Sequence, residues 1–322
     1  MIRQLRAHRL ALKIVAPMTV LSTPALALRA ANRRGIAAMS FAMASFVSND
    51  ALVKYVSQSL APSQLIFIRG LFATALLLAV AHAMGATHQL GVMLQRRVLV
   101  RALIDALATL TYLSSLFHLP LGNATAINMA TPLFITLFAV LAMGERVGAG
   151  RWLAIATGFT GVLLVVQPST SAFNAYALLC LGGTVLHAAR DLMTRTIARS
   201  VPSILITFST AVAVTLFAGA WSLLQQWQPI TMQHLGLLAA ASVFLSGGYY
   251  LLINSMREGE MSVIAPFRYT GLLFALVLGY VVWSDVPNTL AWCGIALLVG
   301  AGLYVLHSER ARTRVALEAA AD

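Results

Sequence analysis

The sequence predicts an all-α polytopic membrane protein with ten transmembrane helices, arranged as two inverted five-helix repeats around a central cavity. Three observations predict this fold: the apolar composition, the one-sided distribution of basic residues and an internal repeat. Hydrophobic residues make up 59% of the 322 residues and charged residues only 10%, whereas soluble domains carry about 25% charged residues. With a mean hydropathy of +0.83, the chain has too little polar surface for a soluble protein of this length.

A helix that crosses the bilayer needs about 20 predominantly apolar residues. Ten apolar segments approach or reach this length, at about 35–57, 62–84, 97–118, 122–143, 151–167, 173–195, 202–224, 233–256, 261–283 and 289–306. The short connections leave no room for a soluble domain. We expect four regions: a basic cytoplasmic tail (1–34), a first repeat (35–168), a second, inverted repeat (169–306) and a cytoplasmic C-terminal tail (307–322). Because "ALA" at 25–27 resembles a signal-peptidase site, a signal peptide and an overlong start are kept as alternatives to the basic tail.

Basic residues in the connections predict the orientation, because cytoplasmic loops retain Lys and Arg. If the N-terminus is inside, the inner connections contain Arg96, Arg97, Arg146, Arg151, Arg199 and Arg257. The five outer connections contain neither Lys nor Arg. This separation predicts ten helices with both termini cytoplasmic. We expect the membrane to be the bacterial inner membrane. Retention of basic residues on the cytoplasmic side also explains the net charge of +12. We therefore expect these residues to face the lipid bilayer, and we do not expect nucleic acid as a partner.

The two halves of the chain repeat each other at a shift of 140 residues. The matched pairs are Leu133 and Leu273, Phe134 and Phe274, Glu145 and Asp285, Trp152 and Trp292, and Ile155 and Ile295. A repeat of five helices is odd-numbered, so the second copy enters the membrane from the opposite face. Inverted repeats of this kind recur in secondary transporters, where the substrate site lies near the midplane between the repeats.

Several charged residues fall within the apolar segments, although a charge at the bilayer centre costs about 2.5–3.5 kcal/mol on insertion scales. Three pairs have the i, i+4 spacing that places both groups on one helix face: Asp50 and Lys54, Arg101 and Asp105, and Asp191 and Arg195. The internal repeat aligns the first pair with the third, and the inversion places these two pairs at opposite ends of the bundle. We expect these two ion pairs to gate the outer and inner ends, with simple helix–helix association as the alternative.

Arg69 and Arg268 have no carboxylate three or four residues away in their own segments. One alternative is that these side chains extend to the lipid headgroups. The other is that each guanidinium lies in a water-filled cavity and binds a substrate carboxylate through two hydrogen bonds. Pro266 favours the cavity, because it removes a backbone donor and loosens the first helical turns.

The repeat aligns Arg268 with Asn128, which precedes a second proline, Pro132. Interrupted segments at matching positions of two halves are the best sequence indication of a transporter site. We therefore predict helix breaks at Pro132 and Pro266. The predicted substrate-binding residues are Arg268, Tyr269, Asn128, Tyr112, Arg69, Tyr249 and Asn254.

Other chemistry is poorly supported by the sequence. The seven histidines are scattered and the two cysteines have no metal-site or disulfide spacing, so we expect neither a metal nor a cofactor. No nucleotide-binding glycine motif and no Ser/His arrangement predicts catalytic residues. A membrane-embedded enzyme and an ion channel are kept as the alternative classes. Gly294, Gly300 and Gly302 form a small-residue stripe that could pack against a neighbouring helix or the second copy of a homodimer.

The stretch "NATAINMATPLFITLFAVLAMGERVGAGRWLAIATGFTGVLLVVQP" (123–168) resembles the drug/metabolite transporter (DMT) superfamily, in its EamA-type branch. Pro132, Gly144-Glu145-Arg146, Trp152, Gly158 and Gly161 follow the order of that family. The second half departs from the pattern at Asp285, where glutamate is usual, and at Leu272, which stands where Pro132 falls in the first half.

The resemblance implies five-plus-five inverted helices around one cavity and secondary transport of a small-molecule substrate by alternating access. An amino acid or amino-acid-like carboxylate is the expected substrate, with export favoured over uptake. Uptake of S-adenosylmethionine, riboflavin or a nucleotide-like anion is the alternative.

Overall fold

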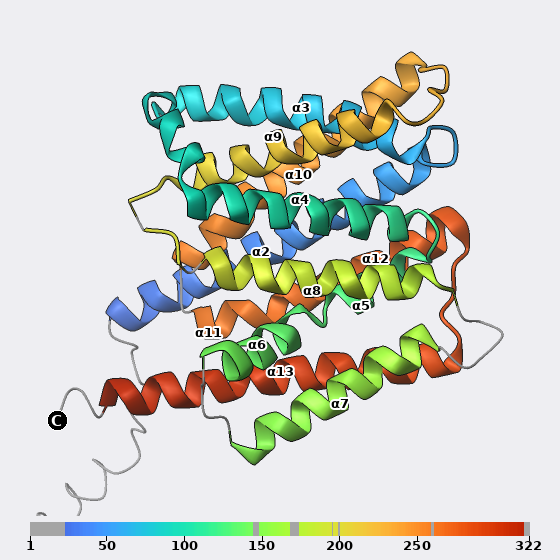
Figure 1. Ribbon diagram of the computed structural model, residues 1–322. Coiled ribbons are helices and arrows are strands. Elements are labelled where there is room, and N and C mark those ends of the chain that lie inside the picture. The colour runs from blue at the N-terminus through green and yellow to red at the C-terminus, as the bar shows by residue number, and fades with distance from the viewer. Residues whose placement is uncertain are drawn as a thin grey trace, which may run out of the picture.

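The computed structural model describes residues 23–143, 148–167, 174–194, 196–198, 200–258 and 261–318 (Figure 1). Three sequence features lie outside these residues: most of the predicted basic tail, the Gly144-Glu145-Arg146 motif and Arg195. The described residues form helices and contain no strand, so the all-α prediction is confirmed for them.

Twelve α-helices and two 3₁₀ helices follow one another along the described chain. They are α2 (Thr23–Val56), α3 (Pro62–Ala83), η1 (Thr87–Leu94), α4 (Arg96–Leu116), α5 (Leu121–Asn128), α6 (Thr131–Met143), α7 (Ala149–Val166), α8 (Tyr176–Thr194), α9 (Ser203–Ser222), α10 (Met232–Glu258), α11 (Met261–Ile264), η2 (Ala265–Tyr269), α12 (Thr270–Trp283) and α13 (Thr289–Glu318). Each of the predicted apolar segments coincides with one helix or with a group of consecutive shorter helices.

Seven helical segments of the described chain are long and apolar enough to cross a membrane, which agrees with a polytopic membrane protein. Two shorter apolar helices lie at Trp152–Val166 and Thr289–Val305. α8 is not among the seven, and it carries His187, Arg190 and Asp191. Ten spans and their inverted arrangement therefore stay predictions.

α2 begins at Thr23, before the predicted start of the first segment at residue 35. The added residues, "TPALALRAANRR", are rich in Ala, Leu and Arg, which have high helix propensity. The arginines of this stretch thus extend the first helix at the end that we expect to be cytoplasmic.

Helices of the two predicted repeats pack mainly against each other. The most extensive pairings are α2 with α10, α7 with α13, α4 with α8 and α3 with α9. In Figure 1, α3 and α9 lie at one edge of the bundle and α7 and α13 at the opposite edge. Each edge therefore pairs a helix from the first half of the chain with one from the second.

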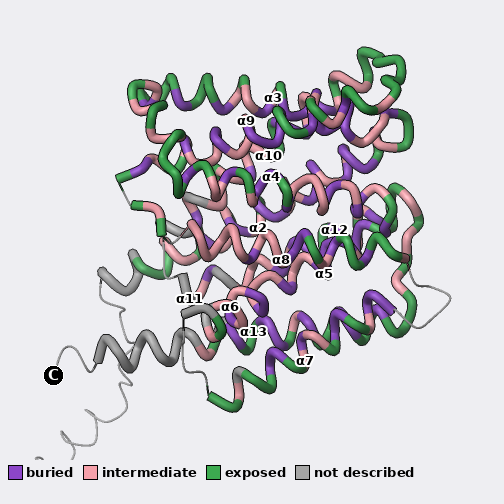
Figure 2. Tube along the Cα trace, in the orientation of Figure 1, coloured by how far each residue is buried: buried purple, intermediate pink, exposed green. Residues whose placement is uncertain are grey.

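Exposed residues lie on the outside of the bundle, whereas buried residues concentrate where helices face each other (Figure 2). Many of the exposed residues are large and apolar. Leu71, Leu216, Leu273 and Val281 are among these exposed side chains. In water such a surface would be an aggregation hazard, but lipid solvates it. The burial pattern thus agrees with helices surrounded by a bilayer.

The chain is interrupted at both positions where prolines predict a break. α5 ends at Asn128, α6 begins at Thr131, and the Thr131 hydroxyl donates a 2.6 Å hydrogen bond to the Asn128 carbonyl. The second interruption is the 3₁₀ helix η2, which contains Pro266 between α11 and α12. A proline cannot donate a backbone hydrogen bond, so continuous α-helix is disfavoured at both places.

α7 and α13 approach closely where two glycines face each other. A methyl group on Gly161 would lie 2.6 Å from the Gly294 carbonyl oxygen, and one on Gly294 would lie 2.5 Å from the Gly161 carbonyl oxygen. Gly302 faces the Tyr269 hydroxyl, whereas Gly300 faces open space. Gly294 and Gly302 of the predicted small-residue stripe therefore pack against other parts of the same chain. Of the three, Gly300 is the one that is open to an external partner.

Replacement of Gly294 by alanine is expected to lower the free energy of unfolding by about 1–3 kcal/mol, because overpacking forces α7 and α13 apart. Gly300→Ala is the matched control in the same helix, where a methyl group meets no atom. We expect the control to be neutral or stabilising, since alanine favours helix over glycine. Titration of both purified variants with sodium dodecyl sulfate in mixed micelles measures the difference, and equal destabilisation would contradict the close contact.

Candidate functional site

A cavity of about 450 Å³ lies at the centre of the bundle. Its lining comes from both halves of the chain, including α2, α3, α4, α8, α9, α10 and both interrupted segments. Seven charged residues line it: Asp50, Arg69, Arg101, Asp105, Arg190, Asp191 and Arg268. Four arginines thus face three aspartates, which gives the lining a formal excess of one positive charge.

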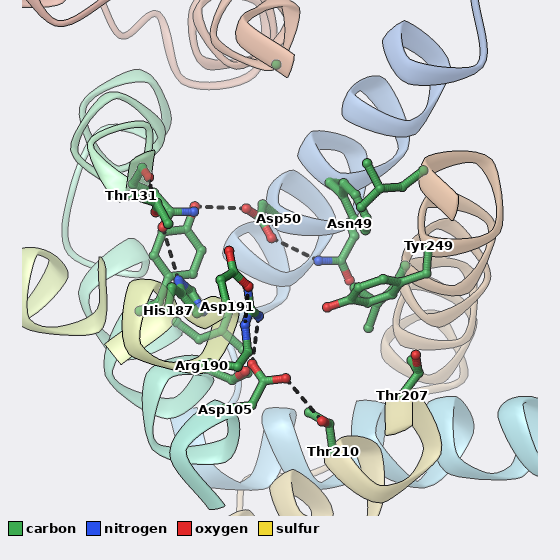
Figure 3. Close-up of a pocket in the computed structure, with 18 of the residues that line it drawn as sticks. Asn49, Asp50, Asp105, Thr131, His187, Arg190, Asp191, Thr207, Thr210 and Tyr249 are labelled. Carbon is green, nitrogen blue, oxygen red and sulfur yellow. Dashed lines mark hydrogen bonds and ion pairs between the residues drawn. The ribbon is translucent and has the colours of Figure 1, made fainter. Parts of the chain in front are cut away.

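Asp105 on α4 is the centre of an ionic network at one side of the cavity (Figure 3). Its carboxylate lies 2.8 Å from Nη1 of Arg190 and 3.1 Å from Nη1 of Arg101, and it accepts a hydrogen bond of 3.1 Å from Thr210. Arg190 also pairs with Asp191, with 2.8 Å between Nη2 and Oδ1. Two arginines and two aspartates therefore balance each other and connect α4, α8 and α9.

The sequence identified the pair of Arg101 and Asp105, but not the second bond from Arg190 to Asp105. That bond joins residues 85 positions apart, and local spacing gives no signal for it. The predicted partner of Asp191, Arg195, lies outside the described residues.

The predicted ion pair between Asp50 and Lys54 is not formed. Instead the Lys54 ammonium donates hydrogen bonds to the carbonyl oxygens of Leu116, at 3.1 Å, and Leu119. It also lies 5.5 Å from the centre of the Trp283 ring. The physical reason is that α4 ends at Leu116, where unsatisfied carbonyls and the helix dipole attract a cation.

Asp50 faces the cavity and is held by two neutral donors. The Tyr112 hydroxyl donates to Oδ2 at 2.9 Å, and Nδ2 of Asn49 donates to Oδ1 at 2.9 Å. Oδ1 of the same Asn49 accepts a hydrogen bond of 3.2 Å from Nη1 of Arg69. A single amide group therefore connects the Asp50 carboxylate to the Arg69 guanidinium, and Figure 3 shows Asn49 beside Asp50.

Arg69 is only 4% exposed and its guanidinium lies among the helices, so it does not extend to the headgroups. Its Nε atom is buried and has no hydrogen-bond partner. Arg268 is half-buried and lines the same cavity. Within the described chain, Arg268 forms neither a hydrogen bond nor an ion pair, so both arginines have donors that the protein does not use.

The other predicted site residues are mostly in the same cavity. Asn128 lines it and contacts His187, with 3.0 Å between Oδ1 and Nδ1. Tyr249 points into it (Figure 3), with its ring 5.1 Å from that of Phe46. Tyr269 lines it too, and its buried hydroxyl lacks a hydrogen-bond partner.

Asn254 is the exception, because it does not line the cavity, although it follows Tyr249 on α10. Asn49 was missed by the sequence analysis. The polar run "SND" at 48–50, within an apolar segment, is the signal that could have identified it. Among the described residues, no group of three His, Cys, Asp or Glu side chains is arranged to hold a metal ion.

Polar contacts join the helices at the end of the bundle where Lys54 lies. Gln64 exchanges two hydrogen bonds with the backbone of Gln228, at 2.8 and 2.9 Å. Gln167 and Asn288 exchange two more between their side-chain amides, at 2.7 and 3.1 Å. The sequence predicts that this end faces outward.

Asp285 lies near Lys54 in the connection between α12 and α13. Burial raises the pKa of the Asp285 carboxyl above its ordinary value, and the Lys54 ammonium partly opposes that shift. No ion pair joins the two within the described residues.

The EamA-like transporter family matches residues 33–167 and 174–306. The Pseudopaline exporter CntI of Pseudomonas aeruginosa is 28% identical over 279 residues, which cover 86% of this chain and 98% of that protein. A riboflavin transporter of Rhizobium johnstonii is 29% identical over 68% of this chain and 72% of its own length.

An S-adenosylmethionine uptake transporter of Rickettsia bellii is 23% identical over 86% of this chain and 94% of its own length. A solved crystal structure shares the fold with a TM-score of 0.57 at 20% identity, over 83% of this chain and 94% of its own. The relatives from Pseudomonas aeruginosa, Rhizobium johnstonii and Rickettsia bellii are all named as transporters. Since the family matches both halves of the sequence, this multi-pass membrane protein belongs to the EamA-like transporter family of the DMT superfamily.

Proposed function

We propose that this protein is a secondary transporter of a small organic metabolite, which works by alternating access in the bacterial inner membrane. An amino acid or amino-acid-like carboxylate is the proposed substrate, with export as the favoured direction. One observation carries the proposal. Arg268, which has no partner among the described residues, lies in a central cavity whose lining has one excess positive charge.

The charge distribution favours an anionic group on the substrate. Arg101, Asp105, Arg190 and Asp191 neutralise one another, so the excess charge belongs to the remaining residues, Arg268 and Arg69 with Asp50. An arginine can bind a carboxylate through two parallel hydrogen bonds. Tyr112, Tyr249 and Tyr269 supply aromatic walls for an apolar body.

An arrangement of ten spans in two inverted repeats is supported by the two interrupted segments. The break at Pro132 and the break at Pro266 occur in matching parts of the two halves. Irregular backbone at membrane depth is tolerated where it is buried in protein or lines a cavity, and both breaks line this one.

A second candidate is uptake of a different metabolite. The relatives from Rhizobium johnstonii and Rickettsia bellii are named for riboflavin transport and for S-adenosylmethionine uptake, whereas the Pseudomonas aeruginosa relative is named as an exporter. A cavity of about 450 Å³ accommodates molecules larger than a single amino acid, which supports either candidate.

Thermal unfolding of the purified full chain in detergent tests the preference for carboxylates. Each small carboxylate in a metabolite panel is compared with its uncharged amide, for example glutarate with glutaramide. We expect stabilisation by carboxylates at concentrations where the amides have no effect. Equal stabilisation by an acid and its amide would argue against an anion-binding cavity, and would favour a neutral substrate.

We further propose that Lys54 helps to close the outer end, in place of the predicted Asp50–Lys54 gate. Its ammonium joins α2 to the carbonyls at the end of α4, near the contacts made by Gln64 and Gln167. Asp191, through Arg190, belongs to the network at the opposite end of the cavity and is proposed for the inner gate.

Lys54→Met is expected to raise the labelling rate of a cysteine at Leu113 by about tenfold or more, because it removes two charged hydrogen bonds. Leu113 lines the cavity, and a membrane-impermeant maleimide added from outside to a chain without Cys180 and Cys293 measures its access. Lys54→Arg keeps a cation at the same place and is the control. An unchanged rate in Lys54→Met would remove Lys54 from the gate.

A further inference from the structure

Asp50 is a carboxylate that lines the central cavity and has no ion pair within the described residues. We propose that Asp50 binds the ammonium group of the substrate while Arg69 binds a carboxylate of the same molecule. The substrate class is then an α-amino carboxylate that carries a further acidic group for Arg268. This inference rests on the proposed transport of carboxylates and deepens it.

The geometry around Asn49 supports a site for two opposite charges that lie close together. Nδ2 of Asn49 donates to Asp50 at 2.9 Å, and its Oδ1 accepts from Arg69 at 3.2 Å. The amide holds the two charged groups near each other and takes the place of a direct ion pair between them. An α-amino acid carries its ammonium and carboxylate on one carbon, so its head group can contact both residues at once.

Both residues retain unused hydrogen-bonding capacity. An ionised carboxylate offers about four acceptor positions, and Asp50 uses two of them for Tyr112 and Asn49. Those two bonds also fix the orientation of the carboxylate. Arg69 donates from Nη1 to Asn49, and its buried Nε has no partner, so its guanidinium can donate further bonds to a carboxylate.

The charges outside the ionic network determine the charge of the ligand. That network is neutral, with two arginines and two aspartates. One carboxylate, Asp50, and two guanidiniums, Arg69 and Arg268, remain on the lining. A molecule with one ammonium and two carboxylates matches these three groups one for one, whereas a simple monocarboxylate would leave Asp50 without a cation.

The aromatic lining suits the ammonium group as well. Tyr112 donates to Asp50, and the rings of Phe46 and Tyr249 also line the cavity. A cation beside aromatic faces in a desolvated site gains a further attraction to the rings. Phosphate or sulfate esters would satisfy the arginines but would be repelled by the carboxylate, and so are disfavoured.

Thermal unfolding of the purified full chain with L-glutamate and with N-acetyl-L-glutamate tests the ammonium site. The two probes share both carboxylates, but only the first carries a cationic amine. We expect L-glutamate to stabilise the wild-type protein at concentrations at least about tenfold lower than those at which N-acetyl-L-glutamate gives the same stabilisation. Asp50→Asn preserves the shape of the side chain but removes its charge. In this variant the concentrations of the two probes that give equal stabilisation should come within about twofold of each other.

Asp285→Asn is the matched control, because Asp285 lies outside the central cavity, and it should keep the wild-type preference. Equal stabilisation of the wild type by both probes would overturn the ammonium site, as would a preference that survives in Asp50→Asn. The wild-type comparison holds even if Asp50→Asn does not fold.

The two proposals fail in different ways. If both probes and glutarate stabilise the protein equally and Arg268→Ala abolishes the effect, the ammonium site is wrong and the carboxylate carrier stands. If no carboxylate stabilises the protein, the proposed function fails together with this inference.

Discussion

Asp105→Ala is expected to lower the free energy of unfolding by about 3–5 kcal/mol, which is the usual cost of removing one partner of a buried ion pair. Asp105 is 3% exposed and neutralises two arginines that are themselves largely buried, Arg101 and Arg190. Without it, these two cations face each other inside the bundle with one remaining carboxylate, Asp191. Unfolding in mixed micelles by sodium dodecyl sulfate measures the loss.

Asp191→Ala is the matched control for Asp105→Ala. Among the described residues Asp191 bonds only to Arg190, and its side chain is 29% exposed, so water can solvate the arginine that it leaves behind. We expect a cost of about 1 kcal/mol or less, as for partly exposed pairs. A loss in Asp191→Ala that equals or exceeds the loss in Asp105→Ala would show that Asp105 is not the centre of the network.

Arg268→Ala is expected to weaken carboxylate binding about 10- to 100-fold, since each hydrogen bond to a charged group contributes about 1.5–3 kcal/mol. Thermal stability without ligand should change little, because Arg268 has no hydrogen bond or ion pair to lose within the described chain. Calorimetric titration of the purified variant, with the carboxylate that best stabilises the wild type, measures the affinity.

Arg96→Ala is the control for this experiment, because Arg96 is exposed at the start of α4, outside the cavity. Arg96→Ala removes one positive charge from the protein, as Arg268→Ala does, but leaves the charge of the cavity lining unchanged. If both variants bind the carboxylate as tightly as the wild type, Arg268 is not a substrate contact.

Local sequence features predicted several of the residues that line the cavity. Prolines mark the two interrupted segments, because the loss of a backbone donor acts within one helical turn. Arg69 and Arg268 were identified because neither has a carboxylate nearby in its own segment. Both then line the cavity, since an unpaired charge in an apolar helix is stable only where water or a polar group reaches it.

Contacts between distant helices could not be predicted in the same way. The i, i+4 spacing correctly joined Arg101 to Asp105 but wrongly joined Asp50 to Lys54. Spacing says only that two side chains share a helix face. Lys54 is instead attracted by carbonyls at the end of α4, and Asp50 is held by Tyr112, 62 positions along the chain.

Counterflow across proteoliposomes tests the central claim of a substrate carrier most directly. Vesicles containing the full chain are loaded with the carboxylate that best stabilises it, and labelled carboxylate is added outside. We expect the label to accumulate in the vesicles with saturable kinetics, driven by the unlabelled substrate inside them. The Arg268→Ala variant should show no such accumulation. A current that rises linearly with voltage, or a flux that does not saturate, would contradict alternating access and indicate a channel.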